Sequence, residues 1–189
     1  KFIAYFQAFT NTYAPVEYLE KIFYEAISDP SVCVLSIGTR TDCFNDEIYD
    51  LLSRLNNIKP VWIELGLQSI HQSTLDAMNT HTKVSDFTVV CNELNKRSIK
   101  VIAHLILGLP GETKEMMLES VDFAAKSNIF GIKLQLLHVL RNTKLAELYE
   151  KDPFGEINTI TLSLSISKMS KKSFSGMDLV LVNDYNAVY

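Results

Sequence analysis

The polar side chains with the clearest chemical meaning lie in one short apolar run, residues 62–69. Successive side chains of a β-strand point to opposite faces, so Glu64 and Gln68 would share one face. A carboxylate in an otherwise apolar strand is costly to bury unless a charged or hydrogen-bonding group meets it. Glu64 therefore either forms a structural ion pair, with Arg40 or Lys133, or joins Gln68 in holding a polar ligand over the strand end.

Two glycines and two histidines mark the ends of other strand-like runs. Gly108 and Gly111 bracket a Leu-Pro pair. Such a turn lets the backbone approach a ligand closely, and the helix that follows offers free amides. A tight strand-to-helix turn is the more common explanation of this spacing. His104 and His138 are candidate ligand contacts, although a lone histidine in an apolar strand more often belongs to the core.

Other common chemistries lack their motifs in this sequence. There is no GxSxG elbow, no GxxxxGK phosphate loop, no GxGxxG and no HExxH pair. The three cysteines, Cys33, Cys43 and Cys91, form no CxxC pair, and their odd number gives no disulfide framework. We therefore expect a reducing, cytoplasmic location.

Length and composition limit the class of protein. The 189 residues are 47% hydrophobic and 21% charged, with a formal net charge of −4. This length corresponds to one domain, or to one domain with a short appendage. The acidity argues against a broad nucleic-acid-binding surface. No apolar run reaches the ~18 residues that a membrane-spanning helix needs, so no membrane partner is expected.

Short runs rich in β-branched and aromatic residues predict strands that begin near Lys1, Val32, Val61, Val101 and Gly131. Amphipathic stretches predict helices over residues 15–27, 45–55, 69–78, 85–96, 112–125 and 143–149. Regular alternation of this kind predicts an α/β fold with parallel strands in sequence order and helices on the outer face. Five such units, over residues 1–152, are too few for a closed eight-unit barrel, so we expect an open sheet or an incomplete barrel.

The two ends of the chain depart from this pattern. Residues 153–189 are expected to form a C-terminal appendage, with an alternating strand at Ile160–Ser167 and a last apolar run at 177–182. Lys1 opens directly into an apolar strand-like run, so we expect residues to be missing upstream. The open edge of that first strand predicts a tendency to form a homodimer.

Five segments, taken together and in order, resemble the radical S-adenosylmethionine (SAM) superfamily. The nearest group is a set of short bacterial proteins similar to the radical SAM domain of the Elongator catalytic subunit. The resemblance covers the chain from residue 1 to about residue 150 and is carried by residues 5–15, 36–42, 64–69, 103–113 and 133–140.

This resemblance implies a partial (β/α)6 TIM-like barrel that lacks its first strand, a [4Fe-4S] cluster, and SAM bound across the strand ends. Such oxidoreductases cleave SAM to a 5′-deoxyadenosyl radical that abstracts hydrogen from a substrate. The substrate is not readable from the sequence; the Elongator likeness points to tRNA, which the net charge does not support. The residues expected to bind the cofactor are Gln7, Thr10, Arg40, Glu64, Gln68, His104, Gly108 and His138.

One departure from the family pattern is serious. The CxxxCxxC motif that holds the cluster is absent, and Cys33 and Cys43 lie too far apart to replace it. We expect the cluster loop to lie upstream of Lys1 and the chain as given to bind no cluster and to be inactive. Two alternatives stay open: a cluster-free relative that serves as a binding or scaffolding module, and a different parallel α/β enzyme.

Overall fold

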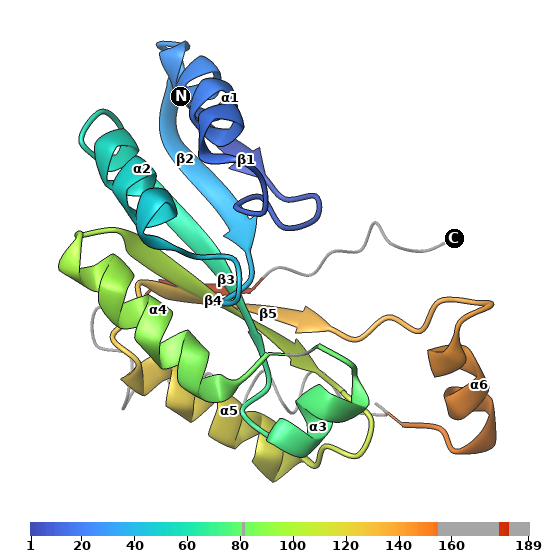
Figure 1. Ribbon diagram of the computed structural model, residues 1–189. Helices are drawn as coiled ribbons and strands as arrows, with labels where there is room; N and C mark the ends of the chain where they lie inside the picture. Colours follow the sequence, from blue (N-terminus) through green and yellow to red (C-terminus); the bar gives the residue numbers. More distant parts are fainter. Residues whose placement is uncertain (81, 155–177, 182–189) are drawn as a thin grey trace.

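The computed structural model describes residues 1–80, 82–154 and 178–181 (Figure 1). Its six strands pair side by side in sequence order, and every neighbouring pair is parallel. The strands are β1 (Phe2–Phe6), β2 (Val32–Thr39), β3 (Val61–Gln68), β4 (Lys100–Leu107), β5 (Gly131–Leu136) and β6 (Asp178–Leu181). The five strands expected from the sequence are confirmed, together with their order and direction.

Helices connect successive strands, as a parallel sheet requires. They are α1 (Val16–Ser28), α2 (Asp46–Asn56), α3 (Gln72–Ala77), α4 (Val84–Lys96), α5 (Lys114–Lys126) and α6 (Lys144–Lys151). Two of the longer helices begin at a side-chain cap, because Asn45 accepts a hydrogen bond from the Ile48 amide and Thr113 accepts one from the Met116 amide. None of the helices in the described part of the chain has the length and apolarity to cross a bilayer.

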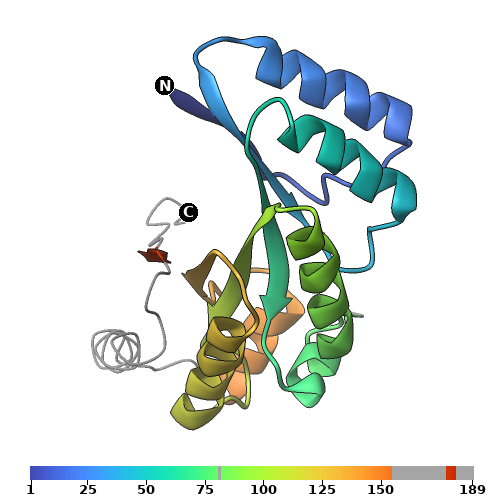
Figure 2. The same cartoon turned by 90° about the vertical axis from the view of Figure 1, so that its left-hand side faces the viewer.

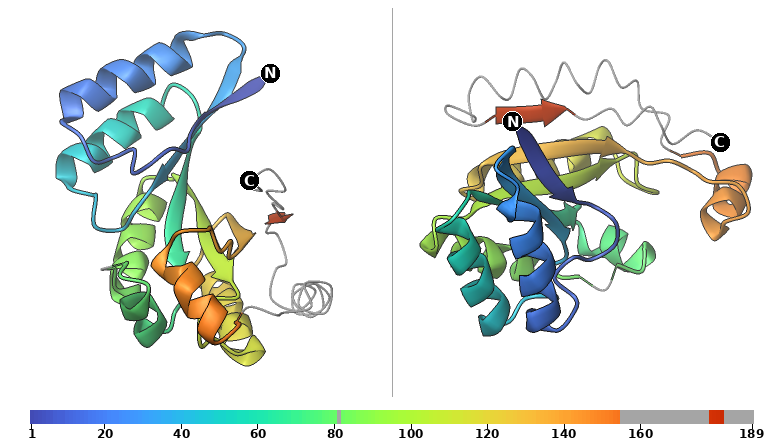
Figure 3. Two further views of the ribbon diagram at one scale, coloured as in Figure 1. Left: turned by 90° about the vertical axis from the view of Figure 1, so that its right-hand side faces the viewer. Right: turned by 90° about the horizontal axis from the view of Figure 1, so that it is seen from above.

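Helices α1, α2, α4 and α5 cover one face of the sheet, whereas α6 lies to one side of it (Figure 1). Helix α1 packs on β2, α2 on β3, α4 on β3 and β4, and α5 on β4 and β5; two views at right angles show the same layer (Figures 2 and 3). Alternate strand residues such as Ile37, Ile63, Leu65 and Leu105 are fully buried under these helices. The arrangement is a half-barrel, and we call the face opposite the helices the inner face.

The last strand extends the same sheet. Strand β6 pairs in parallel with β5, with Lys133 in register with Val180. It lies inside the segment expected as a C-terminal appendage, and residues 178–181 of the apolar run predicted there join the barrel sheet. The predicted strand at Ile160–Ser167 lies outside the described residues.

Candidate functional site

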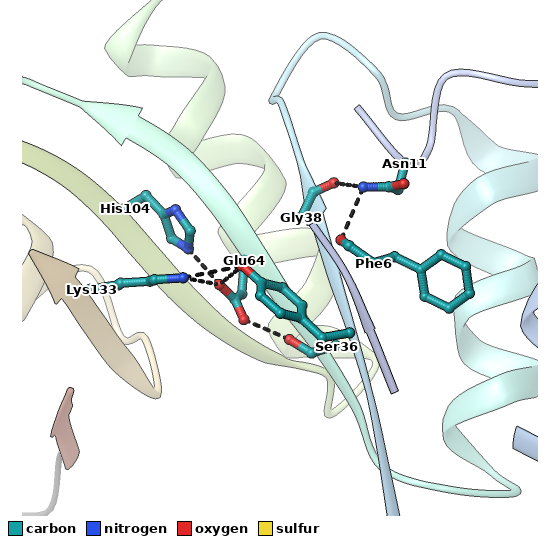
Figure 4. A network of polar contacts seen from close by, with 8 residues as sticks. Phe6, Asn11, Ser36, Gly38, Glu64, His104 and Lys133 are labelled. Carbon is teal, nitrogen blue, oxygen red and sulfur yellow. Dashed lines mark hydrogen bonds and ion pairs between the residues drawn. The ribbon is translucent and has the colours of Figure 1, made fainter. Parts of the chain in front are cut away.

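The carboxylate of Glu64 is the centre of a polar layer on the inner face (Figure 4). Its Oε2 atom accepts hydrogen bonds from the Tyr5 hydroxyl at 2.7 Å and from Nε2 of His104 at 2.7 Å. Nζ of Lys133 lies 3.3 Å from the same oxygen, and the Ser36 hydroxyl donates to Oε1 at 2.7 Å. The four partners come from four different strands, β1, β2, β4 and β5, so the layer extends across the sheet from β1 to β5.

Strand register explains how these side chains meet. Glu64 lies between Ile63 and Leu65, which point into the helix layer, so its side chain points to the inner face. Gly38 of β2 is the register partner of Glu64 and brings no side chain beside the carboxylate. A Cβ atom at Gly38 would lie 3.2 Å from the Phe6 carbonyl oxygen, so this glycine also lets β1 approach β2 closely.

Glu64 is held in its ionised form. Its side chain is only 9% exposed, and this burial raises the pKa. Hydrogen bonds from His104, Tyr5 and Ser36, together with the charge of Lys133, lower the pKa by a larger amount, and the resulting pKa is about 2. At neutral pH this carboxylate therefore carries a full negative charge that its partners neutralise inside the barrel.

Hydrogen bonds join the loops that follow β1 and β2 at the carboxyl edge of the sheet. The Asn11 side-chain amide donates to the Phe6 carbonyl at 2.9 Å and to the Gly38 carbonyl at 3.0 Å (Figure 4). The buried Thr12 hydroxyl lies 2.5 Å from the Thr39 hydroxyl and donates to the carbonyl of Cys43 at 2.7 Å. Between the two loops lies a pocket of about 480 Å³, lined by residues 12–15, 42–45 and Ile48.

The carboxyl end of β3 carries a buried hydrogen-bond acceptor on the side chain of Gln68. Gln68 adopts a left-handed backbone conformation, with φ of 63°. Its side chain folds back over Gly66, where an added Cβ atom would lie 2.8 Å from Nε2. The Oε1 atom of Gln68 is buried and has no hydrogen-bond partner among the described residues. A buried polar atom of this kind is expected to be satisfied by a ligand or by water.

The loop that follows β3 is held against the loop that follows β4. The Ser69 hydroxyl donates to the Glu112 carboxylate and accepts a hydrogen bond from the His71 amide at 3.0 Å. Gly108, with φ of 86°, makes the turn after β4 in a conformation that favours glycine. These contacts fix the position of Gln68 relative to β4.

The structure brings only some of the expected site residues into direct contact. Glu64 meets His104, and its ion-pair partner is Lys133. Arg40 does not reach Glu64, because its guanidinium pairs with the Asp42 carboxylate through bonds of 3.0 Å and 2.5 Å, and both side chains are exposed. The Arg40 hydrogen bonds lower the pKa of Asp42 against the opposing effect of its burial.

The remaining expected residues lie at strand ends without joining the Glu64 layer. Gln7 and His138 are exposed and follow β1 and β5, and Thr10 is half-buried in the loop after β1. Whether these residues contact a cofactor stays a prediction.

Two members of the polar layer, Tyr5 and Ser36, were not among the expected site residues. Strand periodicity contains the signal that could have identified Ser36, because it lies two residues before Gly38 on the same face of β2. Tyr5 pairs in register with Ser36 and is identified by that pairing. The register between strands is a property of the tertiary structure, so the sequence alone does not reveal it.

The cysteines do not fit an iron–sulfur cluster. All three are free, with Cys33 in β2, Cys43 in the loop after β2, and Cys91 buried in α4. No group of three histidine, cysteine, aspartate or glutamate side chains within the described residues could hold a metal ion. A [4Fe-4S] cluster needs thiolates close together, so we derive no role for these cysteines in binding one.

Most of the chain matches the model of a known family. The family model of the radical SAM superfamily matches residues 2–124. The chain belongs to the radical SAM superfamily. Among curated proteins, the uncharacterized protein YtqA of Bacillus subtilis is 42% identical over 151 residues, which are 80% of this chain and 47% of YtqA. The chain spans about half the length of the curated relatives it matches.

Solved radical SAM structures share this half-barrel. Coproporphyrinogen III oxidase of Escherichia coli, a radical SAM enzyme, superposes with a TM-score of 0.71 at 16% identity, covering 89% of this chain and 40% of its own. Elp3 of Methanocaldococcus infernus superposes with a TM-score of 0.67 at 17% identity, covering 94% of this chain and 55% of its own. These likenesses confirm the partial TIM-like barrel, and membership of the superfamily implies a [4Fe-4S] cluster and SAM.

Proposed function

We propose that this chain forms the SAM-binding inner face of a radical SAM enzyme. The observation that carries the proposal is Gln68, whose buried Oε1 atom lacks a partner among the described residues at the carboxyl end of β3. Ligands of parallel βα barrels bind at this end of the strands. The hydroxyl and amino groups of SAM are donors of the kind that such an oxygen accepts.

Two glycines and two polar residues lie near Gln68. Gly66 leaves room for the Gln68 side chain to fold over β3, and Gly108 makes the turn after β4 in a left-handed conformation. Glu64 lies four residues before Gln68 on β3, and His104 of β4 is the register partner of Gly66, over which the Gln68 side chain folds. When bound, SAM supplies the hydrogen-abstracting chemistry of this superfamily. The residues of the inner face orient SAM, and the sheet with its helix layer shields that side of SAM from solvent.

The proposal extends to reaction class and location. We infer an oxidoreductase from the chemistry of the radical SAM superfamily. We infer a cytoplasmic location because free thiols, such as the three cysteines here, persist in a reducing compartment. SAM is the small-molecule partner that this proposal names.

SAM binding tests the proposal directly. We expect SAM to bind the chain in a saturable way in isothermal titration calorimetry. Gln68→Met keeps the volume of the side chain and removes the acceptor, so SAM affinity should fall about tenfold. Gln72→Met, in exposed α3, is the matched control and should leave affinity unchanged. Equal affinity in both variants would argue against the proposal.

A further inference from the structure

The pocket between the loops that follow β1 and β2 is separate from the Glu64 layer. Residues 12–15 and 42–45 line it together with Ile48 of α2. None of these lining residues belongs to the Glu64 layer or to the end of β3 that carries Gln68. Its volume of about 480 Å³ lies within the range of small-molecule sites, ~300–1,000 Å³. The pocket is therefore large enough for a ligand of its own.

Each of the two loops contributes one aromatic ring to the pocket. Tyr13, from the loop after β1, is 81% exposed, so this large ring contributes little to the core of the described chain. Phe44, from the loop after β2, is half-buried and stacks on the buried ring of Tyr49, with ring centroids 5.2 Å apart. The faces of aromatic rings attract cations and apolar groups alike. One held ring and one exposed ring thus line the same pocket.

The charge at this pocket is negative. Asp42 is the charged side chain among the described lining residues, and its carboxylate is 41% exposed. Arg40 bonds to both of its oxygens, yet an ionised carboxylate has about four acceptor positions and can accept further hydrogen bonds. The first turns of the two helices that begin beside the pocket add Glu17 in α1 and Asp46 and Glu47 in α2. These acids outnumber Arg40, so the local potential favours a cation.

The other polar side chains of the lining are engaged within the chain. The buried Thr12 hydroxyl contacts the Thr39 hydroxyl and donates to a backbone carbonyl of the facing loop. The side-chain oxygen of Asn45 accepts a hydrogen bond from the Ile48 amide at the start of α2. The carboxylate of Asp42 is therefore the ionised acceptor that the pocket offers to a bound molecule.

We propose that this pocket binds a small organic cation, an ammonium group carried on an apolar or aromatic body. The ammonium group pairs with the Asp42 carboxylate, and the body packs against the rings of Tyr13 and Phe44. Charge-assisted hydrogen bonds and contacts between cations and aromatic faces are the interactions by which proteins recognise such amines. This inference goes beyond the proposed function and does not require SAM.

Three probes of similar shape separate charge from shape. They are phenethylammonium, the neutral phenethyl alcohol and the anionic hydrocinnamate. In isothermal titration calorimetry we expect phenethylammonium to bind in a saturable way and phenethyl alcohol to bind at least about tenfold more weakly, because it lacks the charge-assisted bond. Hydrocinnamate, which carries the charge of Asp42 itself, should bind more weakly still. Equal affinity of the ammonium and the alcohol, or no binding of either, would overturn the inference.

The thiol of Cys43 locates the bound amine. Cys43 lines the pocket and is free, so phenethylammonium should slow its alkylation by at least about threefold, since the reagent must reach the thiolate. Cys33 of β2 is the internal control, because it is free and half-buried but is not among the lining residues. Unchanged alkylation of Cys43 in the presence of saturating amine would contradict the assignment to this pocket.

Two pairs of variants test the carboxylate and the exposed ring. Asp42→Asn should weaken phenethylammonium binding about tenfold and leave phenethyl alcohol unaffected, because it removes the charge and keeps the shape. Asp76→Asn is its control, since Asp76 is an exposed acid of α3 outside the lining. Tyr13→Ala should weaken both probes about threefold. Tyr18→Ala, at an exposed tyrosine of α1 outside the lining, should weaken neither.

The remaining outcomes separate this inference from the proposed function. Equal losses in Asp42→Asn and Asp76→Asn would show that the amine senses only the overall charge of the chain, which overturns the inference. Displacement of phenethylammonium by SAM would place the amine on the inner face and overturn it as well. Failure of the chain to bind SAM would instead overturn the proposed function and leave the amine pocket in place.

Discussion

Lys133 on β5 and Tyr5 on β1 meet across the inner face, with Nζ and the phenolic oxygen 3.1 Å apart although 128 residues separate them. Three strands lie between β1 and β5 in the sheet. A flat sheet would keep these side chains well apart, since neighbouring strands are about 4.8 Å apart. The contact therefore depends on the curvature of the half-barrel, and both residues also contact Glu64.

Removing the charge of Lys133 should destabilise the chain strongly. Lys133→Met retains most of the volume but leaves the buried Glu64 carboxylate without its cation, and we expect the free energy of unfolding to fall by about 3 kcal/mol. Lys126→Met is the control, because Lys126 forms an exposed ion pair with Asp122 and should contribute less than about 1 kcal/mol. Urea denaturation measures both. Equal losses would contradict the ion-pair interpretation.

Acid should weaken the fold through Glu64. The folded pKa of about 2 lies below the ordinary value of 4.5, so the unfolded state binds the proton more readily. The stabilisation from this group is complete above about pH 4.5 and is lost as the pH falls toward 2; it amounts to about 3 kcal/mol. Urea melts at stepped pH should show this loss in wild type, and Glu64→Gln should remove it. A Glu64→Gln variant that keeps the full wild-type slope would exclude Glu64 as its source.

Alanine at two inner-face glycines should have different effects. At Gly38 the new Cβ atom would meet the Phe6 carbonyl oxygen at 3.2 Å, so β1 must shift, and we expect a loss of about 1–3 kcal/mol. At Gly66 its only contact closer than 3.4 Å would be Nε2 of Gln68, at 2.8 Å, which is the far end of a flexible side chain. Gly66→Ala should thus cost less stability than Gly38→Ala but weaken SAM binding by displacing Gln68. If Gly66→Ala were less stable than Gly38→Ala, β1 would shift more easily than the side chain of Gln68.

The three thiols should react at different rates. Burial raises the pKa of the Cys91 thiol to about 12, and burial together with the Asp42 carboxylate raises the pKa of Cys43. Because the thiolate is the reactive form, Cys91 should stay unmodified by a thiol reagent until the chain unfolds, and Cys43 should react more slowly than a free thiol. Mass spectrometry of labelled peptides resolves the three sites. Rapid labelling of Cys91 in the folded chain would mean that α4 opens locally.

The edge of β1 should promote self-association. Among the described strands β1 pairs with β2 alone, and the side chains of Phe2 and Ile3 on it are 68% and 49% exposed. Exposed apolar edges favour pairing between chains. We expect concentration-dependent sedimentation that Ile3→Lys reduces, with Lys59→Gln, in the loop between α2 and β3, as the control. A wild-type monomer at every concentration would contradict this prediction.

The sequence by itself determined the architecture of this protein. The alternation of β-branched runs with amphipathic stretches, about every 30 residues, is a local property of the chain, and parallel order with helices outside follows from it. The same periodicity placed Glu64 and Gln68 on one face, and the cost of burying a carboxylate required that Glu64 have a partner.

Only the tertiary structure decided which partners Glu64 has. The sequence offered Arg40 and Lys133 equally as partners of Glu64. Arg40 lies just after the end of β2 and pairs with the nearby Asp42, whereas Lys133 contacts Glu64 from two strands away. Periodicity assigns a side chain to a face, whereas register and barrel curvature set the distances between strands. That is the physical reason why Tyr5, Ser36, His104 and Lys133 meet at one carboxylate, a convergence that no single stretch of the chain encodes.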